Sequence, residues 1–216
     1  AIDAMTHDGL TNPFTEKQMI NEASEVSNEL EIARPDMDRW AARSHQLAAK
    51  ATDEGRLAEE IVSVTVRTRK AENVVEADEA IRPDSTVETL AKLPAVGGDD
   101  ATHTAGNSPG VNDGAAAVVV ASDEWAEANG REPLATVLAY GTVADDFPYL
   151  ARTPARAAQQ ALDKLERSAD EVDLWEINEA FASVALNSLR MLGVSEDDVN
   201  VNGGACALGH PIGATG

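Results

Sequence analysis

The order of apolar patterns in the second half of the chain constrains its fold more than any other sequence feature. A short apolar segment typical of a strand comes first. A helical pattern follows, in which Ala158, Leu162 and Leu165 share one face. The whole series is a strand at 135–140, a helix from 153, a strand at 172–177, a helix from 181 to 192 and a strand at 199–202. This order is typical of right-handed βαβ crossovers, in which helices cover a parallel sheet. The sequence therefore predicts the α/β class.

The first half is less regular. Residues 61–66 alternate and are β-branched, which is typical of a strand, and residues 114–121 predict a buried strand around three consecutive valines. Helical patterns cover residues 16–31 and 39–51, whereas residues 67–114 contain many turn signals and predict a long, loop-rich excursion. In the second half, Thr153 and Pro154 predict a helix start with Thr153 as its N-cap.

Composition excludes several classes of protein. The chain has 216 residues, of which 43% are hydrophobic, so it can bury a core and is not intrinsically disordered as a whole. No apolar run approaches the about 20 residues of a membrane span, and residues 1–5 lack the pattern of an export signal. One cysteine, Cys206, excludes an internal disulfide framework and a cysteine-built zinc site. We expect a soluble, cytoplasmic protein with no metal site.

The net charge is unusual. The chain carries 38 acidic and 17 basic residues, which gives a formal charge of −21. Such a field repels the phosphates of nucleic acids and anionic membranes, so neither is expected as a partner. The acids are spread over every segment and lysines are few, a pattern that predicts the solvated acidic shell of a salt-adapted protein.

The segment 200–216 has the highest density of residues that could carry chemistry. Its glycines permit close backbone approach to a ligand, and His210 lies among them as a candidate acid, base or oxyanion donor. A histidine that is merely hydrogen-bonded within a loop is the alternative. Cys206 lies four residues earlier and invites comparison with a nucleophile and base pair. Its apolar neighbours favour a small buried thiol instead.

A second candidate is Asn178, which follows the strand at 172–177 and precedes a helix. Polar groups at the carboxyl ends of strands in α/β folds commonly bind ligands. Asn178 could equally cap the helix, and spacing alone does not separate these two interpretations.

Together these residues carry a resemblance to the thiolase family, whose members make or cleave 3-ketoacyl-CoA. The segments 178–182 and 203–213 resemble two of its motifs, and further similar stretches occur in order over nearly the whole chain. These stretches are His7–Thr11, Ala42–His45, Glu59–Val62, Arg82–Pro83, Ala91–Leu93, Thr104–Asn107 and Asn112–Ala116.

The resemblance implies a five-layered α-β-α-β-α sandwich built from two βαβαβ halves. Residues 1–111 would form the loop domain that binds CoA, residues 112–132 the end of the first half, and residues 133–216 a truncated second half. We therefore expect an internal piece of a longer chain. The intact protein is expected to be a homodimer or homotetramer.

The resemblance also implies a mechanism of the Claisen type. The family's nucleophilic cysteine would lie before residue 1, and its proton-shuttling cysteine would lie in a Cys-x-Gly-Gly-Gly-type segment after residue 216. Cys206 resembles neither of them, so we expect the 216 residues alone to lack thiolase activity. His210 resembles the family's Gly-His-Pro histidine, and Asn178 resembles the residue that holds a water. The histidine and the water would together stabilise the thioester oxygen as it becomes an enolate.

CoA would be bound as a substrate, with no separate cofactor. Arg82 resembles the arginine near the adenine and phosphate end of CoA, and other residues match positions along the nucleotide or pantetheine channel. These are Leu10, Met19, Thr89, Ala105, Ala180 and Phe181. Pro109, and Gln18 and Ile20 beside Met19, depart from the family pattern, so acyl-chain preference stays open. A non-catalytic thiolase-like protein that binds CoA or lipid thioesters, or assembles with a partner, is the alternative function.

Overall fold

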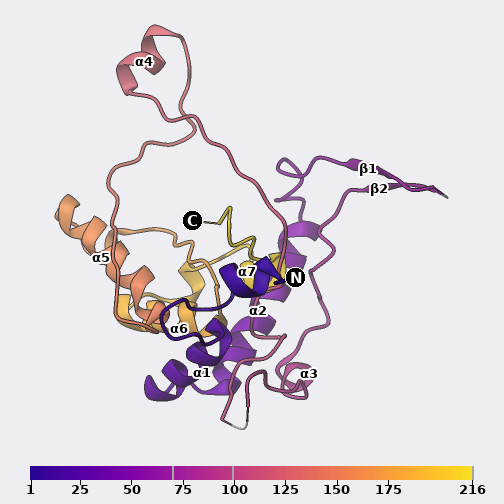
Figure 1. The fold of residues 1–216 in the computed structure, drawn as a ribbon. Coiled ribbons are helices and arrows are strands. Elements are labelled where there is room, and N and C mark those ends of the chain that lie inside the picture. The colour runs from indigo at the N-terminus through magenta and orange to yellow at the C-terminus, as the bar shows by residue number, and fades with distance from the viewer. Residues whose placement is uncertain (70, 99, 216) are drawn as a thin grey trace.

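The computed structural model describes residues 1–69, 71–98 and 100–215, and helices form the centre of the molecule (Figure 1). The longer helices are α1 (Met19–Glu29), α2 (Arg34–Asp53), α5 (Thr153–Leu165) and α6 (Ala182–Leu192). The short ones are a π-helical turn at Met5–Gly9, α3 (Val87–Leu90), α4 (Asp123–Ala128), α7 (Ala205–Leu208) and 3₁₀ turns at Leu150–Arg152, Ala169–Glu171 and Glu196–Asp198. In this described part of the chain, no helix is long and apolar enough to cross a membrane.

Helix α2 is the central element of the packing. Pro35 lies in its first turn, where the missing N–H costs nothing. One face of α2 is buried from Met37 to Ala51, and Trp40 and Ala41 are fully enclosed. This face contacts α3, α6 and α7, so α2 joins segments from both halves of the sequence.

Two apolar clusters lie on either side of α6. The larger one surrounds Trp40 and includes Ile177, Leu189 and Val199. The smaller one joins Val26 of α1 to Val184 of α6, with the Phe181 ring packed against it. The apolar stripe that the sequence predicts for residues 181–192 is therefore confirmed as the buried face of α6.

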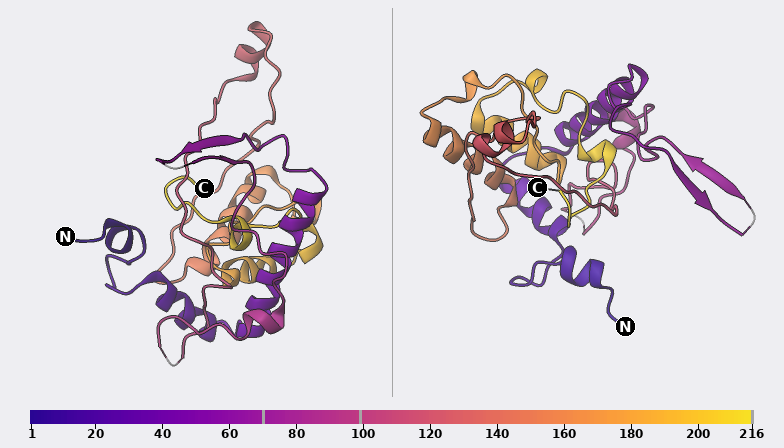
Figure 2. Two further views of the ribbon diagram at one scale, coloured as in Figure 1. Left: turned by 90° about the vertical axis from the view of Figure 1, so that its right-hand side faces the viewer. Right: turned by 90° about the horizontal axis from the view of Figure 1, so that it is seen from above.

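The regular strands form an antiparallel hairpin, β1 (Val64–Arg67) with β2 (Glu72–Val75), which projects from the helical body (Figures 1 and 2). Val64 pairs with Val75 and Arg67 with Glu72. All eight strand residues are exposed. The predicted strand at 61–66 is confirmed from Val64 onward.

Two other predicted strands are not formed. Val118, Val119 and Val120 are 86%, 92% and 82% exposed, and residues 135–140 likewise pair with no described segment. Both stretches belong to an extended arm that carries α4 away from the body (Figure 1). A strand needs a neighbour whose backbone pairs with its N–H and C=O groups, and no described segment forms a β-bridge with these stretches. The prediction of a buried strand at 114–121 is wrong for this structure.

The strands predicted at 172–177 and 199–202 are reduced to a single parallel bridge. The N–H of Trp175 donates to the Asp198 carbonyl at 2.8 Å, and the N–H of Asn200 donates to the Trp175 carbonyl at 2.9 Å. The direction is the one that a βαβ unit requires, with α6 as the crossover.

The predicted start of α5 is also corrected by one residue. A 3₁₀ turn precedes α5, so Arg152 is the N-cap and Thr153 is already helical. The Thr153 hydroxyl donates to the Leu150 carbonyl instead of capping.

Candidate functional site

Asn178 and His210 are 32 residues apart in the sequence and meet in the structure. The Asn178 side-chain nitrogen lies 3.5 Å from both ring nitrogens of His210. Asn178 is exposed and His210 is half-buried, so a ligand can reach both. The two residues singled out by the sequence therefore lie together and form one candidate site.

The backbone around His210 holds it at this position. The His210 N–H donates to the Gly110 carbonyl at 3.2 Å, and the residue forms a parallel bridge with Val111. Burial lowers the pKa of the His210 imidazole. A neutral ring carries one N–H donor and one acceptor at neutral pH, which suits an oxyanion donor.

Asn178 does not cap the helix that follows it. The N-cap of α6 is Phe181, so the structure rejects the capping interpretation. The preceding residue, Ile177, is held by Asn200, which exchanges two hydrogen bonds of 2.8 Å with the Ile177 backbone. These bonds fix the chain just before Asn178 and leave its own side chain free to face His210.

A buried carboxylate beside Asn178 joins the parts of the site, and sequence reasoning missed it. Glu179 is fully buried. Its oxygens accept hydrogen bonds from the Trp40 indole at 2.8 Å and the Ser44 hydroxyl at 2.9 Å. They also accept from the Asn200 amide at 3.0 Å and the Cys206 N–H at 2.7 Å. The sequence signal for Glu179 is a carboxylate just after the predicted strand at 172–177. Its partners, which come from distant segments, could not be read from spacing.

Two glycines let the segment before His210 approach these groups. Gly203 has φ +85°, and a Cβ there would lie 2.6 Å from the Ser44 carbonyl and 2.7 Å from the Ala48 Cβ. A Cβ on Gly204 would collide with the Glu179 carboxylate. The glycines therefore serve close packing against α2 and Glu179.

Cys206 is buried in α7, and its N–H is bound to Glu179. Burial, reinforced by the negative charge of Glu179, raises the pKa of its thiol well above the ordinary value. A thiolate is the reactive form of cysteine, so this environment makes Cys206 inert. The sequence-based interpretation of a small buried thiol is confirmed.

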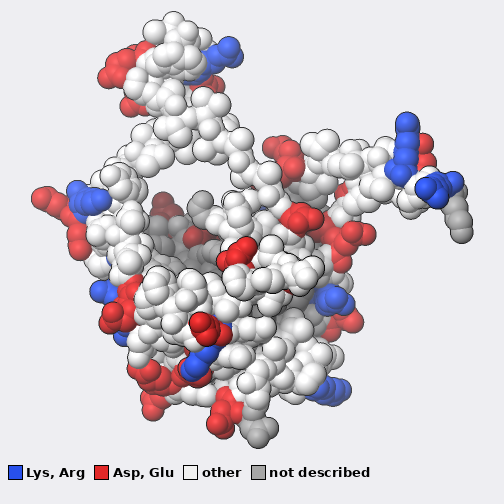
Figure 3. Space-filling model, viewed as in Figure 1, with Lys and Arg blue, Asp and Glu red and all other residues white. Residues whose placement is uncertain are grey.

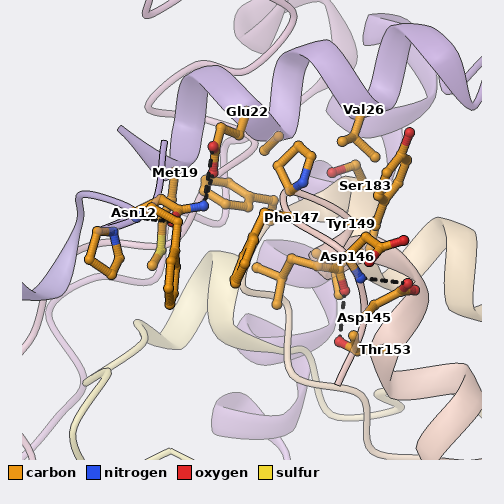
Figure 4. A pocket seen from close by; sticks show the side chains of 18 residues that line it. Asn12, Met19, Glu22, Val26, Asp145, Asp146, Phe147, Tyr149, Thr153 and Ser183 are labelled. Atoms are coloured by element: carbon orange, nitrogen blue, oxygen red, sulfur yellow. Dashed lines mark hydrogen bonds between the residues drawn. The ribbon is translucent and has the colours of Figure 1, made fainter. Parts of the chain in front are cut away.

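Phe181, three residues after Asn178, belongs to the lining of an apolar pocket of about 280 Å³ (Figure 4). Phe181 and Met19, two of the predicted channel residues, line it together with Phe14, Val26 and Phe147. Asp145 also lines it, and the side chains of Arg156 and Arg152 pair with this carboxyl and lower its pKa to about 2.

The other predicted channel residues lie outside this pocket. Leu10 accepts the Met19 N–H, and Ala180 packs against the smaller apolar cluster. Arg82, Thr89 and Ala105 are exposed. The roles of these residues stay predictions.

Comparison with known proteins identifies the family of this chain. Residues 1–124 match the thiolase N-terminal domain and residues 131–216 match the thiolase C-terminal domain. The chain is 45% identical over 212 residues to a beta-ketoadipyl-CoA thiolase of Pseudomonas aeruginosa, covering 95% of this chain and 53% of that protein. It is 42% identical over 215 residues to an acetyl-CoA acetyltransferase of Paracoccus denitrificans, covering 100% of this chain and 55% of the relative.

Solved structures agree. The Bacillus anthracis acetyl-CoA acetyltransferase superposes with a TM-score of 0.93 at 38% identity, over 100% of this chain and 55% of that one. Human mitochondrial 3-ketoacyl-CoA thiolase gives 0.89 at 36% identity, over 96% and 52%. The chain thus spans about half the length of the relatives that it matches, and the expected α/β, thiolase-like fold is confirmed. The chain belongs to the thiolase family.

Proposed function

We propose that the protein carrying this chain is an acyltransferase that forms or cleaves 3-ketoacyl-CoA by Claisen chemistry. The contact between Asn178 and His210 supports this most directly, because it gathers two donors at one exposed point. Removing a proton α to a thioester puts negative charge on the carbonyl oxygen. Preorganised donors at that oxygen each stabilise it by about 3 kcal/mol.

In this proposal His210 donates its ring N–H to the thioester oxygen, and Asn178 holds a water that donates to the same oxygen. The pocket lined by Met19 and Phe181 takes the apolar part of the ligand. Cys206 takes no part, because its thiol is buried and its pKa is raised.

CoA is the substrate that we propose, bound with no separate cofactor. Arg82 suits the phosphate end, since its side chain is exposed and forms no ion pair within the described residues. We also propose a homodimer or homotetramer in the cytoplasm of a salt-adapted organism, with a role in fatty acid metabolism. The acidic composition supports the salt adaptation.

Turnover of acetoacetyl-CoA with CoA by the full-length protein tests the proposal. We expect His210→Ala to lower kcat by about 10²-fold, the usual loss for one oxyanion donor. Asn178→Ala should lower it less, because a second water can partly replace the amide. His7→Ala is the matched control, because the His7 side chain is 65% exposed and contacts the neighbouring Asp8 instead of Asn178.

Unchanged turnover in both variants would remove the oxyanion-hole role. If the full-length protein binds CoA but shows no turnover, the non-catalytic alternative is supported instead.

A further inference from the structure

A buried chain of hydrogen bonds ends at the wall of the apolar pocket. The Ser24 hydroxyl of α1 lies 3.1 Å from Nδ1 of His103, and Nε2 of His103 lies 2.9 Å from the Ser183 hydroxyl of α6. All three residues are at most 4% exposed. The His103 ring meets Phe181 edge to face at 5.0 Å, which fixes its orientation. These hydrogen bonds involve neither Asn178 and His210 nor the carboxylate of Glu179.

The groups around Ser24 determine which atoms donate and which accept in the hydrogen bonds from Ser24 to Ser183. The Ser24 oxygen accepts the N–H groups of Thr102 and His103 at 3.2 and 3.4 Å, so its own proton is available for Nδ1. The Thr102 hydroxyl, 3.4 Å from Nδ1, is a second donor to the same atom. Burial lowers the pKa of His103 to about 4, so the ring is neutral at pH 7. A neutral ring that accepts at Nδ1 must donate at Nε2.

The Ser183 oxygen therefore accepts from His103, and its own proton remains to be donated. Ser183 lines the pocket, together with other polar side chains (Figure 4). Those other donors are already engaged: the Asn12 amide donates to Glu22, the Tyr149 hydroxyl to Glu29 and the Thr153 hydroxyl to the Leu150 carbonyl. Among the described residues, Ser183 is the lining hydroxyl whose proton has no acceptor.

The remaining lining decides which acceptor suits this proton. Glu22, Asp145 and Asp146 also line the pocket, so an anionic group would meet carboxylates there. The rest of the wall is mainly apolar and offers few partners to a strongly polar ligand. A hydrocarbon chain with one neutral oxygen satisfies both conditions.

We propose that Ser183 is a specificity-determining residue, which donates a hydrogen bond to a neutral oxygen of the acyl chain held in this pocket. The substrate class is thus a 3-ketoacyl thioester whose chain carries a further ketone, hydroxyl or ether oxygen. This rests on the proposed acyltransferase function. Ser24 and His103 are positioning residues, because they orient the Ser183 proton and do not touch the chain.

The first experiment compares kcat/KM of the full-length protein for 3-ketooctanoyl-CoA and for analogues in which one chain methylene is replaced by an ether oxygen. We expect the best ether analogue to be preferred, and Ser183→Ala to reduce this preference about three- to tenfold, the value of one neutral hydrogen bond. Ser24→Ala should reduce it less, because Thr102 still donates to His103. Ser188→Ala is the control, because Ser188 is buried on the same helix and bonds to the Val184 carbonyl.

The second experiment needs no turnover. Ligand-observed NMR measures the affinity of 2-pentanone and of 2-methyl-1-pentene, in which a methylene group replaces the ketone oxygen. We expect the wild type and Ser188→Ala to favour the ketone, and Ser183→Ala to lose about three- to tenfold of this preference.

The outcomes separate the two proposals. A ketone preference that depends on Ser183, in a protein without thiolase turnover, supports the role of Ser183 and refutes the acyltransferase function. Turnover with preference ratios that Ser183→Ala leaves unchanged overturns the role of Ser183. An equal loss of affinity for both members of each pair shows a merely structural serine and also overturns it, as does the absence of binding of either NMR ligand to the wild type.

Discussion

At the scale of single residues, His103 makes stability depend on pH. Its folded-state pKa is about 4, below the ordinary value of 6.5, because burial and the nearby Arg34 disfavour the charged ring. As pH falls from 6.5 to 4, the unfolded chain takes up a proton that the folded chain excludes, so the free energy of unfolding falls. The full loss is about 3 kcal/mol. Above pH 6.5 this contribution to stability is complete.

Urea unfolding between pH 4.5 and 7.5 measures this effect, with His103→Gln as the comparison. The variant should lose stability less steeply on acidification than the wild type. Burial also lowers the pKa values of His45 and His210. In both proteins these two residues therefore also make the free energy of unfolding fall as the pH is lowered. Parallel curves for wild type and variant would contradict the prediction.

Cys206 should be chemically silent in the folded protein. Its thiol is buried and its pKa raised, so a disulfide reagent should react with it only after unfolding. Cys206→Ser keeps the backbone N–H that Glu179 accepts, and turnover should stay within about twofold of wild type. Thiol titration with and without denaturant, followed by the acetoacetyl-CoA assay, checks both points. Loss of turnover in a folded Cys206→Ser protein would give Cys206 a catalytic role.

At the scale of elements, the contact between α2 and the segment before α7 depends on Gly203. An alanine there would strain a backbone with φ +85° and press its Cβ against Ser44 and Ala48. We expect Gly203→Ala to lower the free energy of unfolding by about 2–4 kcal/mol, the sum of backbone strain and overpacking.

Gly193 provides the matched control for this substitution. It ends α6 with φ +68°, and nothing lies within 4 Å of a Cβ built on it. Gly193→Ala should therefore cost about 1–2 kcal/mol of strain alone. Chemical unfolding of the two variants compares these costs, and equal losses would mean that α2 does not restrict Gly203.

At the scale of the whole molecule, the charge of −21 predicts a dependence on salt. Acidic side chains are spread over the visible face, with fewer basic ones between them (Figure 3). Raising the salt concentration from 0.1 to 1 M shortens the Debye length from about 10 to about 3 Å, which weakens both self-repulsion and the repulsion of CoA phosphates. Tm and CoA affinity of the full-length protein should therefore both rise from 0.1 to 1 M KCl. If Tm and CoA affinity are both already maximal at 0.1 M KCl, the acidic composition has a cause other than salt adaptation.

The sequence by itself determined the family and the longer helices, and it singled out the two residues of the candidate site. Helical hydrogen bonds are local, so α5 and α6 form where the apolar stripes predict helices, and Leu162 and Leu189 of those stripes are buried. Asn178 and His210 both lie in motifs that can be recognised along the chain, and the structure brings their side chains together.

Only the tertiary structure decided which strands form and which polar groups are buried together. The valines at 118–120 have strand propensity, but pairing depends on a neighbour elsewhere, and they remain exposed. Glu179 and Trp40 are 139 residues apart, and His103 and Ser183 are 80 apart. No local pattern encodes such pairs, because a buried polar group is satisfied by whatever donors the packing brings to it.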